Sequence, residues 1–112
     1  MFGFQKLDVY GCAVQRLALT VPLSAAVPRD YAALAEQLRR AVVSIPLNIA
    51  EGSGTFGNDA KRFYAIARGS ALESAAILDA IEIIVPHSKT DLEQPRGLLD
   101  RIVAMLTNMI QR

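Results

Sequence analysis

The chain has 112 residues, which is enough for one domain with a single core, and we expect residues 1–112 to form that domain. Hydrophobic residues make up 52% of the chain, which indicates either an enriched core or apolar surface covered by other subunits; we favour the second. The net charge of +1 excludes a strong overall attraction of the single chain to nucleic acid or anionic lipid.

The cysteine content and the uncharged segments bear on the compartment. The one cysteine, Cys12, excludes an intrachain disulfide and is typical of a reducing environment. The longest uncharged run, 17–28, is interrupted by Pro22 and is shorter than the ~18 residues that span a membrane. Asp8 and Arg16 precede it in an amphipathic pattern that does not suit a signal peptide. We therefore expect a cytoplasmic protein that makes no membrane contact.

Helical periodicity appears first in two segments of the N-terminal half. The apolar face of the first segment is formed by Leu7, Tyr10, Val14, Leu17, Ala18 and Val21. Asp8 and Arg16 lie off this face, and Pro22 and Pro28 are expected in the connection that follows. The second face is formed by Tyr31, Leu34, Leu38, Ala41, Val42, Ile45 and Ile49. Asp30 is a suitable N-cap for this helix, and Gly52 fits the left-handed position that ends one.

The third helix is predicted to be long, roughly 58–85, beginning at Asn58 or Asp59 and ended by Pro86. Its face is formed by Phe63, Ile66, Ala67, Ser70, Ala71, Ser74, Ile77, Leu78, Ile81 and Ile84. Its centre is rich in small residues on several faces, which indicates either close contact with neighbouring subunits or simply good helix propensity. These small residues are Ala65, Ala67, Gly69, Ser70, Ala71, Ser74, Ala75, Ala76 and Ala80.

The fourth helix has two candidate starts. Thr90 and Glu93 have capping-box spacing, whereas Pro95 would suit the first helical position. The apolar face is formed by Leu98, Leu99, Ile102, Val103, Leu106, Met109 and Ile110. Four amphipathic helices with short connections predict an all-α fold, namely an antiparallel up-and-down four-helix bundle.

The sequence contains few residues of the types that usually carry out catalysis. We interpret His87 as a solvent-facing loop residue and Cys12 as a small buried hydrophobe. The sequence has neither a Cys/His cluster nor the Glu-x-x-His pairs that hold metals in helical bundles. The glycine-rich segment 52–57 follows a helix and lacks the Gly-Lys-Ser/Thr ending of a phosphate loop, which favours a hinge or helix cap. We expect no enzymatic activity, no metal and no cofactor.

A narrow polar stripe surrounds Pro46 in the second helix. Arg40, Ser44, Asn48 and Glu51 fall within about 80° of one another at 100° per residue. Pro46 lacks an N–H donor, so the helix is expected to kink there and to free backbone groups. Three interpretations remain open: a solvated face, a structural hydrogen-bond network, or a ligand or nucleic-acid contact. In the network, Glu51 or Glu73 would pair with Arg40, and Asn48 would cap the freed groups.

Two segments resemble a known family. Residues 40–52, RAVVSIPLNIAEG, closely resemble the "RAA-S-IP-NIAEG" signature of small four-helix-bundle proteins, many of them encoded in intervening sequences of bacterial large-subunit ribosomal RNA genes. Residues 63–73, FYAIARGSALE, are similar to that family's "F-x-x-A-x-GS-x-x-E" segment. The resemblance covers essentially the whole chain, and it places Gly52 and Glu73 in the family motifs. It implies an antiparallel bundle that assembles as a ring, commonly of five subunits, without established enzymatic activity.

The resemblance also raises a nucleic-acid hypothesis, because similar bundles serve reverse transcriptases of diversity-generating retroelements as basic accessory barrels. Members usually carry several basic residues after the motif glycine, whereas 53–58 holds none here and Asp59 follows. The candidate contacts for nucleic acid are Arg39, Lys61, Arg62 and Arg68. We expect weak or absent nucleic-acid binding.

Two functions follow as hypotheses. The first is a homo-oligomeric scaffold or adaptor, expected to be a pentamer, that binds itself and in addition a protein partner or none. The second is an accessory protein for RNA or a reverse-transcription complex. Without the resemblance, two-fold symmetry would favour a dimer.

Overall fold

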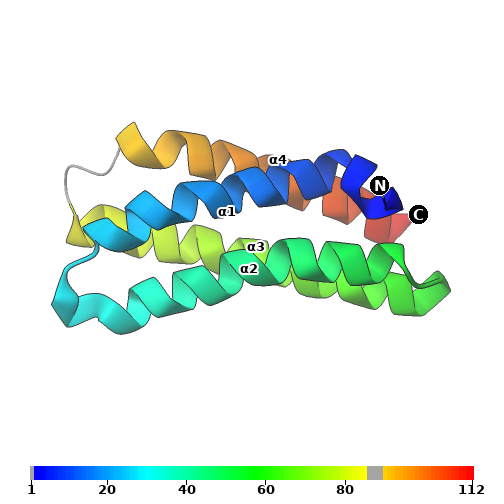
Figure 1. Ribbon diagram of the computed structural model, residues 1–112, viewed down its shortest axis with the longest axis horizontal. Helices are drawn as coiled ribbons and strands as arrows, with labels where there is room; N and C mark the ends of the chain where they lie inside the picture. Colours follow the sequence, from blue (N-terminus) through cyan, green and yellow to red (C-terminus); the bar gives the residue numbers. More distant parts are fainter. Residues whose placement is uncertain (1, 86–89) are drawn as a thin grey trace.

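The computed structural model describes residues 2–85 and 90–112 of the chain. Four long helices follow one another: α1 (Asp8–Ala26), α2 (Ala32–Ser53), α3 (Gly57–Ile84) and α4 (Glu93–Gln111). Short 3-10 turns precede three of them: η1 (Gly3–Lys6), η2 (Arg29–Tyr31) and η4 (Thr90–Leu92). Successive helices run in opposite directions, so both ends of the chain lie at the same end of the molecule (Figure 1). The predicted all-α, up-and-down four-helix bundle is confirmed.

The helices pack in a ring in the order of the chain. Contacts join α1 to α2, α2 to α3, α3 to α4 and α4 to α1, and the α2–α3 pair is the most extensive. Short connections produce this order because they leave each helix antiparallel to its sequence neighbour. As a result, α1 and α3 occupy diagonal corners of the bundle and run in the same direction (Figure 1).

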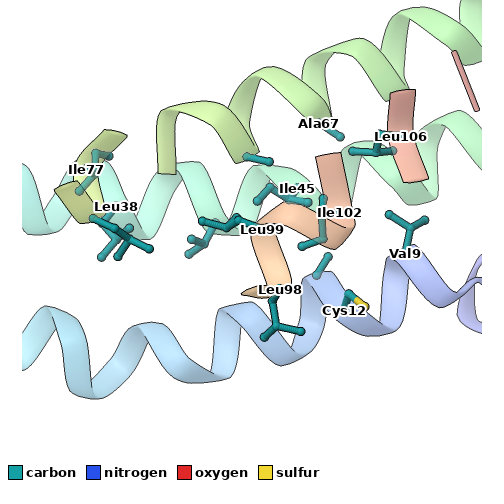
Figure 2. Packing of buried hydrophobic residues seen from close by; sticks show 14 of the residues in the cluster. Val9, Cys12, Leu38, Ile45, Ala67, Ile77, Leu98, Leu99, Ile102 and Leu106 are labelled. Atoms are coloured by element: carbon teal, nitrogen blue, oxygen red, sulfur yellow. The ribbon is translucent and has the colours of Figure 1, made fainter. Parts of the chain in front are cut away.

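The core lies along the bundle axis and draws on all four helices. Its fully buried large side chains include Leu38, Ile45, Ile49, Leu78, Ile81, Ile102 and Leu106. Figure 2 shows such side chains from neighbouring helices pointing into one shared interior. Burying each Leu or Ile contributes roughly 1.5–3 kcal/mol. For α2, α3 and α4, most of the predicted apolar face is buried or half-buried, so the predicted orientation of these helices is confirmed.

The orientation predicted for α1 is wrong. Its buried residues are Val9, Cys12, Ala13, Arg16, Thr20 and Leu23. Val14, Ala18 and Val21, which were assigned to the core face, are exposed. The predicted and buried faces are centred about 140° apart at 100° per residue. Both sides of this helix are apolar or small, so periodicity alone could not select the side that meets the other helices. The expectation that Cys12 is buried is confirmed.

Arg16 is completely buried on the inner face of α1. Its Nη1 donates to Thr20 Oγ1 at 2.9 Å, and Thr20 Oγ1 donates to the Arg16 carbonyl at 3.2 Å. Arg16 Nε and Nη2 find no hydrogen-bond partner among the described residues. Burial lowers the pKa of Arg16 to about 10, because desolvation disfavours the charged form.

The ends of α1 and α2 differ from the predictions, each for its own physical reason. Helix α1 continues through Pro22 to Ala26; Pro22 is exposed, so water can serve the carbonyl that the proline leaves without a donor. Gly52 does not end α2 but lies inside it, and Gly57, with φ of 61°, is the described residue that adopts the left-handed conformation. A Cβ at Gly52 would lie 2.6 Å from the Tyr64 ring, so glycine is required for close packing of α2 on α3.

The first residues of the helices also differ in detail from the predicted ones. Tyr31 rather than Asp30 is the N-cap of α2, and it makes no side-chain cap bond. Helix α3 begins at Gly57 and ends at Ile84, within one residue of the prediction. Helix α4 begins at Glu93, which matches neither candidate start. Pro95 is therefore its third residue, where the backbone N–H would have no intrahelical partner in any case. Pro86 and His87 lie outside the described residues.

Candidate functional site

Part of the polar stripe around Pro46 forms a chain of hydrogen bonds between α2 and α3. Asn48 Nδ2 donates to the Ser44 carbonyl at 2.8 Å and to Ser44 Oγ at 3.0 Å. Ser70 Oγ donates to Ser44 Oγ at 2.8 Å, and Ser74 Oγ donates to the Ser70 carbonyl at 2.9 Å. Pro46 itself is buried, and α2 remains one helix through it. The stripe thus supplies a half-buried polar link between the two most closely packed helices.

The charged members of the stripe lie outside this link. Arg40 Nε donates to Glu36 Oε1 at 3.2 Å rather than to Glu51 or Glu73, both of which are exposed. Arg39 Nη2 donates to Glu36 Oε2 at 2.9 Å. The hydrogen bond from Arg39, aided by its charge and by Arg40, lowers the pKa of Glu36. Sequence reasoning missed this role of Glu36, although its i+3 and i+4 spacing to the two arginines was a usable signal.

An open groove runs along the outer side of α2 beside the hydrogen-bonded link. Its volume is about 550 Å³, and its lining consists of Glu36, Arg39, Arg40, Val43, Ser44, Leu47 and Asn48. Val43 and Leu47 are 39% and 61% exposed and form its apolar part. Neither histidine nor cysteine lines it, so the groove lacks the side chains that most often act as base or nucleophile. Its chemistry suits a contact surface with apolar and hydrogen-bonding parts.

The four candidate nucleic-acid contacts do not form one cluster. The Ser44–Ser70 hydrogen bond marks the level at which α2 and α3 meet, with Arg39 on one side of it and Lys61 on the other. At 1.5 Å per residue, these two cations are about 20 Å apart along the bundle. Arg39 therefore lies well away from Lys61 and Arg62, which are adjacent on α3.

Each of these cations also has a partner within the chain. Arg39 is paired with Glu36, and Lys61 Nζ donates to the Arg112 carbonyl at 3.2 Å. Arg62 lies 5.0 Å from the centre of the Phe63 ring, and Arg68 Nε donates to Thr107 Oγ1 at 2.8 Å. In the described residues, groups of three or more His, Cys, Asp or Glu side chains that could hold a metal ion are absent. Within the same ranges, none of the helices is long and apolar enough to cross a membrane.

The hydrogen bonds between α2 and α3 lead to a prediction about the stability of an Asn48 variant. Asn48→Ala removes both bonds to Ser44, and we expect it to lower the free energy of unfolding by about 1 kcal/mol. Thermal and urea unfolding followed by circular dichroism would measure this loss. Asn108→Ala, at an exposed position of α4, is the matched control and should change stability by less than about 0.5 kcal/mol. Equal stability of the two variants would contradict a structural role of Asn48.

Comparisons with known proteins bear on the same residues. A search of curated proteins found no match to the chain. A protein-family model described as the 23S rRNA-intervening sequence protein matches residues 5–108, a range that contains the polar link, the groove, α1 to α3 and most of α4. This match extends over nearly the entire bundle and agrees with its helical architecture. The chain therefore belongs to the 23S rRNA-intervening sequence protein family.

Proposed function

We propose that the chain works as a non-enzymatic, homo-oligomeric helical scaffold or adaptor, with five copies in a ring. The observation that carries this proposal is the outer surface of α1. Arg16 is the one charged residue between Asp8 and Arg29, and it is buried. The side of α1 that faces away from the core therefore presents no charge, while Val14 and Val21 are 42% and 73% exposed.

Helix α4 provides the contrast within the same molecule. Its exposed residues include Glu93, Gln94, Asp100, Arg101, Asn108 and Gln111. A helix whose outer side stays in water is normally polar there, as α4 is. An outer side that is apolar along its length is typical of a surface that another subunit covers. This difference supports self-association through α1.

The mass in solution tests the proposal. Sedimentation equilibrium at micromolar concentration should detect one species of five chains, each of 12.1 kDa. Val21→Lys should weaken assembly because it places a charge on the covered surface, whereas Ala104→Lys on the polar side of α4 should leave it intact. A single species of 12.1 kDa at these concentrations would contradict the proposal. A stable dimer would retain self-association and exclude the pentamer.

For the nucleic-acid hypothesis, we propose weak or absent binding. The support is that Arg39 lies about 20 Å from Lys61 along the bundle, and that all four cations, Arg39, Lys61, Arg62 and Arg68, are engaged within the chain. Binding that rests on few phosphate contacts has little affinity at physiological salt, so fluorescence anisotropy with labelled RNA and DNA at about 150 mM salt should detect no submicromolar binding. A saturable submicromolar signal, weakened by Arg39→Ala and Lys61→Ala, would instead favour the accessory-protein function.

A further inference from the structure

We propose that the outer face of α1 in one copy docks on the outer face of α3 in the next copy, with the two helices parallel. This inference rests on the proposed self-association and specifies the surfaces that produce it. The α1 outer face consists of the exposed residues Gly11, Val14, Ala18, Val21, Pro22 and Ala25. The α3 outer face consists of the exposed residues Ala65, Ile66, Gly69, Leu72, Ala76 and Ile83.

The exposed side chains show that the two faces are similar in kind. On α3, Ile66, Leu72 and Ile83 are 42%, 47% and 82% exposed, next to the small residues between them. Gln15, Glu73 and Asp79 are the exposed polar residues that interrupt the two faces. The faces extend over about 15 and 19 residues, so at 1.5 Å per residue their lengths differ by about 6 Å, or roughly one helical turn.

Exposed glycines without a close neighbour inside the chain occur on both faces, and Gly97 of α4 is a further one. A Cβ added at Gly11 or at Gly69 would have no atom within 4 Å to meet. Glycine weakens a helix interior compared with alanine, so its presence at both positions is unexplained in the isolated chain. Close approach of a neighbouring helix backbone is the situation in which such a glycine is useful.

The arrangement of the helices indicates that the occupant is a second copy of this chain. Helices α1 and α3 lie at diagonal corners, so one molecule cannot bring its own two faces together. Pairing α1 with α1 would leave the α3 outer face uncovered. Pairing α1 with α3 of the next copy covers both faces with one type of contact and closes a ring when the rotation permits it. Because α1 and α3 run in the same direction (Figure 1), rotation about an axis along the bundle makes them parallel at every contact.

Charges at the ends of the two faces also favour a parallel orientation of α1 against α3 of the next copy. Asp8 is exposed at the start of α1, and Arg62 is exposed near the start of α3. At the other end of α3, Asp79 and Glu82 both accept hydrogen bonds from Arg96, so this end keeps a net negative charge. A parallel contact brings Asp8 to Arg62, whereas an antiparallel contact would bring it to the acidic pair. Complementary charges therefore favour the parallel contact.

Disulfide trapping tests the contact and its direction. Aligning Asp8 with Arg62 places Val21 beside Ala76, while the antiparallel alignment places it near Ala65, about 16 Å away along α3. In a Cys12→Ala background, oxidised Val21→Cys/Ala76→Cys should form a covalent ladder beyond the dimer on a non-reducing gel. Val21→Cys/Ala65→Cys has the same number of exposed thiols and is the matched control, which should remain mostly monomeric on the gel.

The possible results separate this inference from the proposed function. A ladder from the control alone would overturn the parallel direction, and a covalent dimer of the Val21→Cys single variant would indicate an α1–α1 contact instead. Sedimentation of the Cys12→Ala parent provides the second measurement. Assembly of the parent without any trapping of Val21→Cys/Ala76→Cys would overturn the docking mode and leave self-association standing. A monomeric parent would overturn both.

Discussion

Arg16 is buried on the side of α1 that packs against α2 and α4. Its guanidinium lies fully inside the bundle, and the one side-chain partner that the structure gives it is Thr20. Desolvating a cation is unfavourable, and a single hydroxyl offsets only part of that cost. The inner side of α1 is therefore a compromise between this buried charge and the packing of Val9, Cys12 and Leu23. The opposite side, which is entirely uncharged beyond Asp8, is left to face outward.

The proposed self-association would account for this orientation of α1. If a neighbouring copy covers α1, the outward apolar surface is removed from water, and that gain belongs to the assembly rather than to the single chain. Folding and assembly would then be coupled, so apparent stability would rise with protein concentration. The groove on α2, with Val43 and Leu47 between charged residues, lies outside both docking faces.

The sequence predicted the bundle and the inner faces of three helices because each of these has one clearly apolar side. It could not orient α1, where Val14 and Val21 compete with Val9 and Leu23 on a helix with only two charged residues. Helix ends were harder still: Pro22 was tolerated inside α1, and Gly52 serves packing against Tyr64 rather than chain reversal. Such effects depend on tertiary neighbours, which local patterns do not contain.

The candidate site was predictable to a similar extent. The spacing of Ser44 and Asn48 correctly placed them together on α2, and the structure adds Ser70 from α3, which periodicity had assigned to the core face. The partner of Arg40 was missed, although the i,i+4 spacing of Glu36 to Arg40 pointed to it. In the structure the nearest turn of the same helix supplies it, through Glu36.

The central claim is that α1 is covered in the working protein, and thiol accessibility tests it most directly. Val21→Cys in a Cys12→Ala background should react slowly with a maleimide at assembling concentrations and faster on dilution. Ala104→Cys on the polar side of α4 should react rapidly throughout. Equal, concentration-independent rates at the two positions would contradict the claim, because the 73% exposure of Val21 in the single chain would then persist in solution.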